Sequence, residues 1–401
     1  MASETKEAKE KLTEGHGRGA VATATAAPLR ILIVGPSLDI LGGQAVQAVR
    51  LIERLREEPS LDVSFLPINP PFPKLLKKVQ GIKYVRSIRS TLLYWVSLLA
   101  RVRKYDVIHI YAASYLSFMI SPTPAFLIAK LYGKKILLNY HSGHAERHLE
   151  RWKRTAIPTI RLADITIVQS EYLVDVFARF GLPAQAIFNH IETEHFHFRE
   201  RRPLRPLFLS NRNLEPIYNV GCVIRAFALV QERFPDACLT VAGDGSQRAE
   251  LERLANDLRL RNVKFTGLIA PEKMVELYDA ADIFLNGSEV DNMPLSLLEA
   301  FAAGLPVVTT DAGGIPYIVA DEETGFVVKK GDHAAMAERA IRFLTDNELA
   351  VKMANRAREE CSRYSWAEVR NKWLSVYHAL AQDRVVAVNQ HAACDQAPTN
   401  E

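Results

Sequence analysis

Cysteine is scarce in this chain of 401 residues, which has only Cys222, Cys238, Cys361 and Cys394. None of the four stands in a CxxC pair, the spacing on which many zinc sites and redox motifs depend. We therefore predict free thiols in a reducing compartment, and neither a disulfide framework nor a metal site.

Long apolar runs are missing as well. No stretch reaches the roughly 18 uncharged apolar residues of a membrane-spanning helix. Residues 1–29 contain no Phe, Trp or Tyr, and their polar composition predicts a disordered tail, not a signal peptide. A second flexible tail is predicted over residues 383–401. These absences together predict a cytoplasmic protein.

A strong overall charge is also lacking. The formal net charge is +4, from 50 basic and 46 acidic residues, so no field of one sign favours nucleic acid as a partner. Hydrophobic residues make up 48% of the chain. This composition suits a globular protein of two domains or more.

Acidic residues are absent from one long segment, residues 74–104. Its nine basic residues are Lys74, Lys77, Lys78, Lys83, Arg86, Arg89, Arg101, Arg103 and Lys104. They interleave with apolar residues such as Leu92 and Trp95. One interpretation is a buried helix with a solvated basic face. The other is peripheral contact with the inner face of a membrane, where the protein would reach a lipid-linked acceptor.

Apolar runs alternate with helical patterns through residues 30–198. Five of these runs predict buried strands, at 29–34, 61–66, 107–111, 135–140 and 165–168. A helix is predicted over about 44–57, where apolar residues recur on one face. Such alternation predicts an α/β domain, in which a parallel sheet carries helices on both faces.

The pattern breaks at residues 199–206, which are charged, contain two prolines and lack periodicity, as in a linker. The alternation then restarts over 207–364. We predict two Rossmann-like, doubly wound domains, 30–198 and 207–364, facing each other across a cleft, because ligands of such sheets bind beyond the carboxyl ends of the strands. A last helix over 365–382 is expected to pack back on the N-terminal domain.

The most informative stretch runs from Ser288 to Thr310. It contains Asp291, then a turn, then a predicted helix that carries Glu299. The first turn of a helix offers unpaired N–H groups to an anion, and a carboxylate on either side can accept hydrogen bonds from hydroxyls. This arrangement suits a nucleotide-sugar, whose sugar, diphosphate and ribose lie in line. Two acids at this spacing are common by chance, so the motifs around them carry the weight.

Several short motifs follow one another in order along the chain. They are Gly42-Gly43, Asn211-Arg212, Ala242-Gly243-Asp244-Gly245, Val263-Lys264-Phe265-Thr266-Gly267, and the pair Asp291 and Glu299. In this order the sequence resembles a family 4 glycosyltransferase (glycosyl transferases group 1) of the GT-B fold over about residues 30–382. The second half carries the more specific part of the resemblance.

The resemblance implies a retaining glycosyltransferase. It would move a sugar from a nucleoside-diphosphate-sugar, with UDP or GDP, to a hydroxyl of a glycan, a lipid or a small molecule, for instance in polysaccharide biosynthesis. The C-terminal domain would bind this donor and the N-terminal domain the acceptor. The family needs neither a metal nor a cofactor, and the sequence contains no DxD metal motif.

Carried over by position, the resemblance implies a catalytic role for three residues. Asp291 would bind the hydroxyls of the donor sugar, Arg212 would neutralise the diphosphate, and His141 would lie near the anomeric centre. Glu299 would hold the ribose. Further donor contacts are implied for Met293, Leu295 and Ser296 through their backbone N–H groups, and for Gly43, Tyr218 and Gly243.

The sequence departs from the family pattern at three places. The first acidic residue is Asp291 where Glu is usual. The usual Gly-Phe-Gly turn is replaced by residues 292–294, Asn-Met-Pro, and the proline has no N–H to offer. A lysine that usually follows the arginine is missing, and Tyr218 falls near its position. Tyrosine can donate one hydrogen bond but brings no charge.

Alternatives stay open for the residues and for the activity. Glu289 competes with Asp291, and His144 or His148 competes with His141, because the three histidines are spaced as on one helix face. The missing lysine favours a weak or inactive relative that binds a nucleotide or glycan without transfer. A third class is another two-domain sugar enzyme, such as an epimerase or a phosphorylase.

Overall fold

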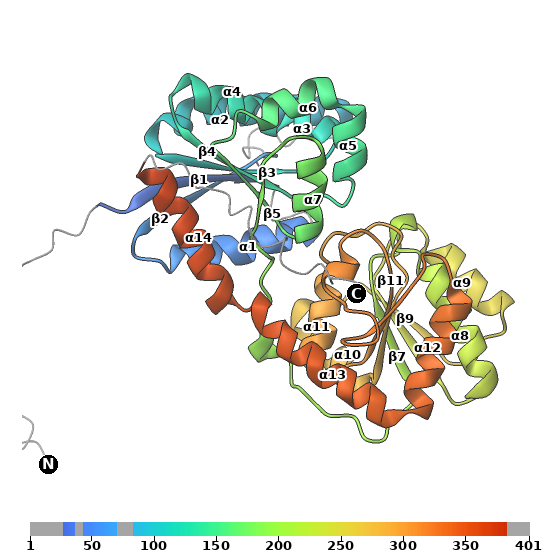
Figure 1. The fold of residues 1–401 in the computed structure, drawn as a ribbon. Helices are drawn as coiled ribbons and strands as arrows, with labels where there is room; N and C mark the ends of the chain where they lie inside the picture. Colours follow the sequence, from blue (N-terminus) through green and yellow to red (C-terminus); the bar gives the residue numbers. More distant parts are fainter. Residues whose placement is uncertain (1–26, 37–42, 70–82, 383–401) are drawn as a thin grey trace, which may run out of the picture.

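The computed structural model describes residues 27–36, 43–69 and 83–382, which form two α/β domains, one above the other in Figure 1. The predicted tails, 1–29 and 383–401, lie outside the described residues except for residues 27–29. Gly42 and residues 74–82 of the basic segment lie outside them as well.

The N-terminal domain is built on a parallel six-stranded sheet of order β2-β1-β3-β4-β5-β6. The strands are β1 Leu29–Gly35, β2 Leu61–Pro67, β3 Val107–Ala112, β4 Lys135–Tyr140, β5 Ile165–Val168 and β6 Gln185–Ala186. The first five coincide with the predicted apolar runs. The sixth has only two residues, too few to show a period.

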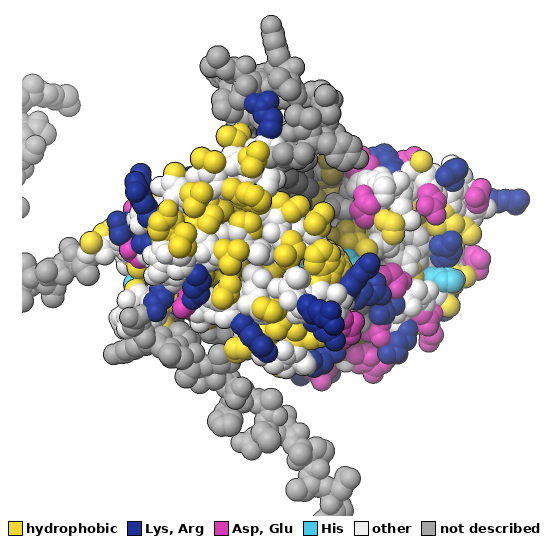
Figure 2. Space-filling model, turned by 90° about the horizontal axis from the view of Figure 1, so that it is seen from above, with side chains coloured by type: hydrophobic (Ala, Val, Ile, Leu, Met, Phe, Trp, Pro, Cys, Tyr) yellow, Lys and Arg dark blue, Asp and Glu magenta, His cyan; other side chains and the backbone are white. Residues whose placement is uncertain are grey.

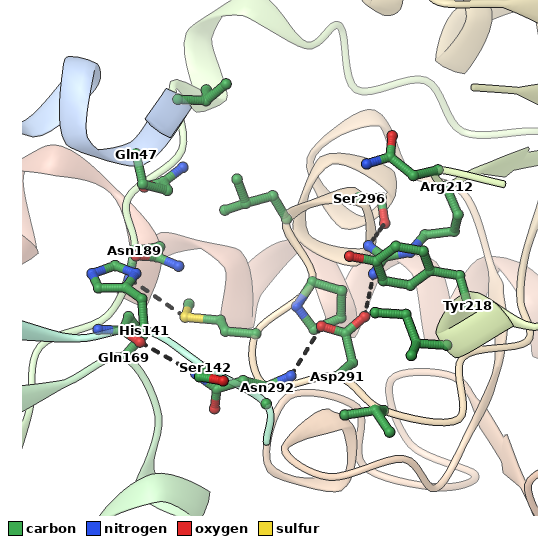
Figure 3. Close-up of a pocket in the computed structure, with 18 of the residues that line it drawn as sticks. Gln47, His141, Ser142, Gln169, Asn189, Arg212, Tyr218, Asp291, Asn292 and Ser296 are labelled. Atoms are coloured by element: carbon green, nitrogen blue, oxygen red, sulfur yellow. Dashed lines mark hydrogen bonds and ion pairs between the residues drawn. The ribbon is translucent and has the colours of Figure 1, made fainter. Parts of the chain in front are cut away.

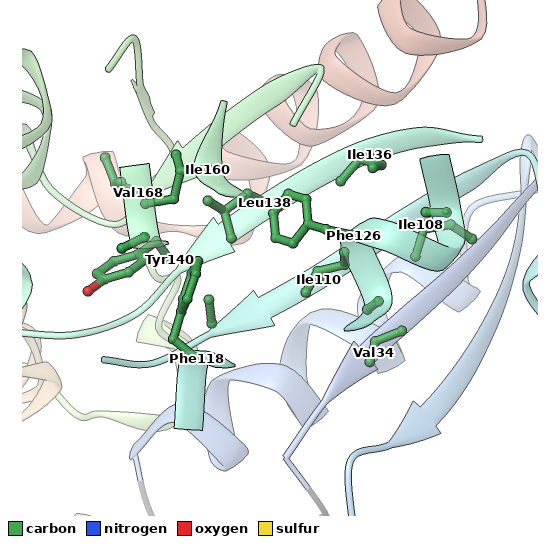
Figure 4. Packing of buried hydrophobic residues seen from close by; sticks show 14 of the residues in the cluster. Val34, Ile108, Ile110, Phe118, Phe126, Ile136, Leu138, Tyr140, Ile160 and Val168 are labelled. Carbon is green, nitrogen blue, oxygen red and sulfur yellow. The ribbon is translucent and has the colours of Figure 1, made fainter. Parts of the chain in front are cut away.

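Helices cover both faces of this sheet. They are α1 Gly43–Arg56, α2 Lys83–Arg101, α3 Leu116–Ile120, α4 Pro122–Leu131, α5 Ala145–Arg151, α6 Lys153–Ile160 and α7 Glu171–Arg179. Because side chains alternate along a strand, Leu32 and Val34 pack towards α2–α7, whereas Ile31 and Ile33 pack towards α1. Figure 4 shows the first of these layers, with Phe126 lying over the middle of the sheet.

The C-terminal domain repeats this plan with the strand order β12-β11-β10-β7-β8-β9. Its strands are β7 Leu207–Asn211, β8 Cys238–Ala242, β9 Val263–Gly267, β10 Ile283–Asn286, β11 Val307–Thr310 and β12 Phe326–Val328. Its helices are α8 Val220–Arg233, α9 Arg248–Asp257, α10 Pro271–Ala280, α11 Leu295–Ala303, α12 His333–Thr345 and α13 Asn347–Cys361. The predicted class of two doubly wound domains is confirmed.

The last helix, α14 (Trp366–Ala381), returns to the N-terminal domain and lies beside α1 under its sheet (Figure 1). Its buried face carries Trp373 and Tyr377, which are 3% and 0% exposed. Both rings lie against His109 of β3, and the Tyr377 hydroxyl is 2.7 Å from His109 Nδ1. Full burial of such side chains contributes about 1.5–3 kcal/mol each, so α14 is firmly held there.

The segment 199–206 is packed along the C-terminal domain. The Arg201 side chain is fully buried and donates hydrogen bonds to the carbonyls of Tyr278, Ala281 and Ala303. These carbonyls belong to the last turns of α10 and α11 or follow them directly, where helices leave acceptors unpaired. The charge of this segment, which suggested a linker, thus serves to cap two helices.

The chain crosses between the domains twice, and the two crossings lie side by side. Ile191 N donates to Tyr364 O at 3.0 Å. The rings of Phe188 and Tyr364 lie 5.2 Å apart, and those of His190 and Trp366 lie 5.0 Å apart. Both connections therefore meet at one place, the arrangement that a hinge between two domains requires.

Candidate functional site

A cleft of about 430 Å³ separates the two sheets. Its walls come from residues that follow the carboxyl ends of strands in both domains: His141 after β4, Gln169 after β5, Arg212 after β7 and Asp291 after β10. This is the edge at which parallel sheets of this type bind ligands. Figure 3 shows these side chains converging from the two domains.

Arg212 is fixed on three sides in the wall formed by the C-terminal domain. Its Nη2 pairs with Asp291 Oδ2, and its Nη1 donates to Ser296 Oγ at 3.3 Å. Its Cζ lies 4.1 Å from the ring centroid of Tyr218, a cation–π contact. Its Nε is buried without a hydrogen-bond partner among the described residues. The guanidinium is therefore oriented in advance and keeps one donor unused.

Two glycines let the backbone approach these side chains closely. Gly243 has a φ of 134°, and a Cβ there would lie 2.2 Å from the carbonyl oxygen of Arg212. Gly313 has a φ of 52°, and a Cβ there would lie 2.0 Å from the carbonyl oxygen of Asp291. Gly243, predicted to contact the donor, does not line the cleft. It supports the backbone of Arg212 from behind.

Helix α11 begins at the cleft. Pro294 precedes it and offers no side-chain cap, while Leu295 and Ser296 form its first turn and line the cleft. The N–H groups of a first turn carry partial positive charge and stabilise an anion placed before them. Glu299 lies one turn further along and accepts a hydrogen bond from the Tyr278 hydroxyl at 2.8 Å.

Burial raises the pKa of both carboxyls in the cleft. For Asp291 the Arg212 cation and the backbone N–H of Asn292 oppose this effect. For Glu299 the opposing groups are the Tyr278 hydroxyl, then Arg50 and Arg212. Each carboxylate is thus short of solvation, and a ligand that donates hydrogen bonds would relieve it. The rival Glu289 accepts from Asn219 Nδ2 at 2.7 Å and does not line the cleft.

The N-terminal domain contributes a face of α1 to the opposite wall. The helix begins at Gly43, and Val46, Gln47 and Arg50 line the cleft at the spacing of one helix face. Gln47 Nε2 is buried without a partner among the described residues. Arg50 was missed in the sequence, although its position seven residues after Gly43 places it on the same face.

His141 lies deep in the same wall. Its ring stacks on Tyr111 at 4.9 Å, and burial lowers its pKa to about 3. It is therefore neutral at physiological pH, and its Nε2 has no partner within the described part of the chain. His144 also lines the cleft, whereas His148 is buried behind it and bonds the Tyr140 hydroxyl at 2.8 Å. The interpretation of one helix face was wrong, because α5 begins only at Ala145.

The turn after Asp291 touches both domains. Asn292 bonds Ser170 Oγ, and its Nδ2 donates to Gln169 Oε1 at 3.3 Å. Met293 Sδ accepts from the backbone N–H of Asn189 at 3.4 Å. Eight predicted site residues line this one cleft: Asp291, His141, Arg212, Glu299, Met293, Leu295, Ser296 and Tyr218.

The described residues, 27–36, 43–69 and 83–382, contain neither a metal-binding cluster nor a membrane-spanning helix. No cluster of three or more His, Cys, Asp or Glu side chains there is placed to hold a metal ion. No helix there combines the length and apolar character needed to cross a membrane.

Comparison with known families assigns both domains. Residues 41–195 match the family described as Glycosyltransferase Family 4, and residues 192–360 match Glycosyl transferases group 1. The chain belongs to this family of glycosyltransferases, and the predicted resemblance is confirmed.

Individual relatives align over part of their length. Sulfoquinovosyl transferase SQD2 of Arabidopsis thaliana is 28% identical over 299 residues, which are 69% of this chain and 57% of the relative. A GDP-mannose-dependent monoacylated alpha-(1-6)-phosphatidylinositol monomannoside mannosyltransferase of Corynebacterium glutamicum is 34% identical over 170 residues, 40% of this chain and 44% of the relative. The chain thus spans about half the length of these relatives.

A solved structure shares the fold. Anabaena Alr3699/HepE in complex with UDP-glucose superimposes with a TM-score of 0.67 at 18% identity. The match covers 88% of this chain and 100% of that one. Both domains and their mutual arrangement therefore follow a known GT-B architecture.

Proposed function

We propose that this protein is a retaining, metal-independent glycosyltransferase that uses a nucleoside-diphosphate-sugar as donor. The observation that carries the proposal is the convergence of Arg212, Asp291, Glu299 and the start of α11 on one cleft between two sheets. The UDP-glucose of the structural neighbour and the GDP-mannose of the mannosyltransferase support this donor class. They leave UDP and GDP as alternatives for the base.

The donor would lie along the wall formed by the C-terminal domain. Its diphosphate would meet Arg212 and the backbone N–H groups of Met293, Leu295 and Ser296, where cation and helix dipole act together. Glu299 would accept hydrogen bonds from the ribose hydroxyls. The sugar would then extend towards Asp291 and the other domain.

In the chemical step the oxygen of the acceptor hydroxyl would bond to the anomeric carbon as the bond from that carbon to the diphosphate oxygen breaks. Negative charge develops on the departing diphosphate, which would take up the hydroxyl proton. The unused Nε–H of Arg212 and the start of α11 are oriented before that charge develops, which is the most effective form of electrostatic stabilisation. His141, being neutral, can donate to a sugar oxygen without competing for the diphosphate. Asp291 has a double role here, because it also orients the guanidinium of Arg212.

A second function, nucleotide or glycan binding without transfer, is favoured by the tyrosine at the position of the usual lysine. Tyr218 supplies no charge and instead stacks on Arg212. Arg50 argues against this alternative. It lines the cleft from α1, and its charge lowers the pKa of Glu299. Arg50 offers a second cation from the opposite domain, which a donor diphosphate would meet once the domains close.

The acceptor would enter along the N-terminal domain, past His141 and His144. The names of the relatives include a small molecule, inositol 3-phosphate, and a phosphatidylinositol mannoside. A glycan, a small molecule and a lipid are therefore candidate acceptors. A cytoplasmic location with peripheral contact at the inner face of a membrane belongs to this proposal.

The experiment that tests the proposal pairs ligand binding with product formation. We expect UDP or GDP, and one of their sugars, to raise the melting temperature of the wild-type protein, because a ligand at about a hundredfold excess over its Kd adds roughly 2.7 kcal/mol of stability. Glu299→Ala should lose this shift. With that donor, wild type should then release the nucleotide by transfer or slow hydrolysis. Nucleotide binding without release would favour the second function. No binding of any of these nucleotides or nucleotide-sugars would overturn the proposed donor and leave glycan binding as the remaining alternative.

A further inference from the structure

Helix α2 is apolar on two opposite faces. Tyr94 and Leu98 point into the N-terminal core and are 1% and 0% exposed. Leu92, Trp95, Val96 and Leu99 follow the other face at helical spacing and are 39–63% exposed. A surface helix normally presents charged or polar residues on its outer side. The outer face of α2 therefore lacks the character of a solvated surface.

The neighbouring helices extend this face. On α3, Leu116 and Ile120 are 60% and 40% exposed, and on α4, Leu127 and Leu131 are 58% and 75% exposed. Hydrogen bonds join the helices edge to edge: Trp95 Nε1 donates to Ile120 O at 3.3 Å, and the Tyr132 hydroxyl donates to Leu99 O at 3.4 Å. The outer apolar patch consists of Leu92, Trp95, Val96, Leu99, Leu116, Ile120, Leu127 and Leu131.

Figure 2 looks down on this part of the N-terminal domain, and hydrophobic side chains gather over it with Lys and Arg around them. Of the fourteen large hydrophobic residues with the greatest exposure in the described chain, nine lie between residues 92 and 132. Such concentration on one face marks an interaction surface, whereas single exposed leucines are ordinary.

The charge of the sequence around the outer apolar patch indicates which kind of partner would cover it. Between residues 63 and 145 the sequence has twelve lysines and arginines and one acidic residue, Asp106. Asp106 is itself paired with Arg30 at 2.8 Å. Because the whole chain carries only +4, the remaining residues are net acidic. An apolar surface set in a basic region complements an anionic lipid bilayer, to which basic residues and inserted apolar side chains contribute together.

We propose that the outer apolar patch docks this protein on an anionic membrane surface, with α2, α3 and α4 at the level of the lipid headgroups. The exposed basic residues Arg103 and Lys104, which follow α2 in the chain, would meet the headgroup phosphates. This docking does not depend on the transferase activity.

The patch reaches the edge of the cleft. Tyr115, the residue before Leu116, lies with its ring 6.2 Å from that of His144, which lines the cleft. A hydroxyl carried by a lipid whose chains stay in the bilayer would therefore be presented at the acceptor side. If the proposed function holds, the acceptor is a membrane lipid.

The experiment is co-sedimentation of the full chain with vesicles of phosphatidylcholine and phosphatidylglycerol in equal parts, compared with phosphatidylcholine alone. Wild type should bind the anionic vesicles and lose binding as salt is raised. Val96→Gln/Leu127→Gln/Leu131→Gln should weaken the binding about tenfold or more, since inserted apolar area sets its strength. Arg103→Gln/Lys104→Gln should weaken it about tenfold, because each basic residue adds to the attraction.

Two control variants carry the same kinds of substitution, Leu to Gln and Lys to Gln, on the surface of the C-terminal domain. Leu229→Gln/Leu258→Gln/Leu268→Gln and Lys273→Gln/Lys352→Gln alter residues that are exposed there, and both should bind vesicles like wild type. Equal loss in patch and matched variants would overturn the proposal. So would wild-type protein that stays in solution, or a dimer that the patch substitutions dissociate, since the patch would then hold a second copy of the chain.

Donor binding separates this inference from the proposed function. The patch variants should keep the nucleotide-dependent thermal shift, and Glu299→Ala should keep vesicle binding. If the wild-type protein shows the nucleotide-dependent thermal shift but does not bind vesicles, only the proposed membrane docking is refuted. Vesicle binding without any nucleotide shift refutes the donor site and leaves the membrane surface standing.

Discussion

The two walls of the cleft are built differently although the domains share one architecture. In the C-terminal domain, two short segments, residues 211–218 and 290–299, supply all the lining residues. In the N-terminal domain the lining comes from α1, from the ends of β4 and β5, and from the crossing near Asn189. If the C-terminal wall binds the donor, as proposed, its two segments can be preserved while the other wall, built from several segments, changes with the acceptor.

The two domains also differ in which side chains they expose and which ionisable groups they bury. The N-terminal domain exposes the outer apolar patch. It buries His109 and His148 in its interior and half-buries His141 in the cleft wall, and burial lowers the pKa of each to about 3 or 4. In the C-terminal domain, charged residues such as Asp282 are paired instead. The comparison predicts that donor chemistry depends on the C-terminal wall, and that acid sensitivity and acceptor contact depend on the N-terminal domain.

The strongest test of this division is Arg212→Ala. Removing the oriented cation should lower kcat by about a thousandfold, as for loss of a preorganised donor at a developing charge. Arg212→Lys should recover part of the rate, because a lysine keeps the charge but not the planar contacts with Asp291 and Tyr218. Initial rates of nucleotide release measure both.

Arg225→Ala is the matched control, since this exposed arginine of α8 bonds the carbonyl of Gly221 in its own helix. It should turn over like wild type. An Arg212→Ala enzyme that retains a tenth of the wild-type rate while folding normally would show that the C-terminal wall does not carry the chemistry.

Glu299 should act mainly on donor affinity. Glu299→Ala removes the carboxylate at the proposed ribose position and should raise KM for the donor by about thirtyfold with a smaller change in kcat, the signature of an interaction present before and during the reaction. Glu299→Gln should raise KM less, because the amide oxygen still accepts a hydrogen bond from the Tyr278 hydroxyl. If kcat falls and KM does not, Glu299 takes part in the chemical step and the proposed ribose contact is wrong.

The sequence predicted the parts of this molecule that are local. Strands of four to seven residues stand out as runs rich in apolar residues, and the segment from Asp291 to Glu299 predicts a loop followed by a helix. Strand β12, with three residues, and β6, with two, gave no pattern. Only short segments with their own period or motif can be recognised this way.

Contacts between distant residues could not be predicted. Arg50, Gln169 and Asn189 lie far apart in the sequence and meet at the cleft only because the N-terminal domain folds. Tyr218 looked like the loss of a cation, yet its ring lies on Arg212, a relation that depends on how the turn at 216–218 folds back. The outer apolar patch could be predicted only in part. The sequence showed the basic charge of this region but not which apolar side chains the fold leaves exposed.

Arg50 tests whether the N-terminal wall of the cleft also binds the donor. If a cation from the N-terminal domain serves the donor diphosphate, Arg50→Gln should raise KM for the donor about tenfold, close to the value of one charged contact. Arg56→Gln, at the end of the same helix, is the matched control, as Arg56 bonds the carbonyl of Val63 outside the cleft. A normal KM in Arg50→Gln would confine donor binding to the C-terminal wall.

The smallest expected effect concerns acid stability. Burial lowers the pKa of His148 from 6.5 to about 4 in the folded protein, whereas the unfolded chain takes up a proton near 6.5. Below pH 6.5 the unfolded state therefore binds more protons, and the free energy of unfolding falls as pH decreases towards 4, while above 6.5 this histidine has no effect. His148→Asn should reduce the loss between pH 6.5 and 5.5 by about 1 kcal/mol.

Urea titrations followed by tryptophan fluorescence suit this measurement, because the four tryptophans, Trp95, Trp152, Trp366 and Trp373, lie in the N-terminal domain or on the α14 region packed against it. His378→Asn, exposed on α14, should show the wild-type dependence on pH. An unchanged dependence in His148→Asn would mean that this histidine is not the proton-sensitive group. Acid weakening would then have to be sought in other histidines whose pKa burial lowers, such as His109 and His141, to about 3, and His190, to about 4.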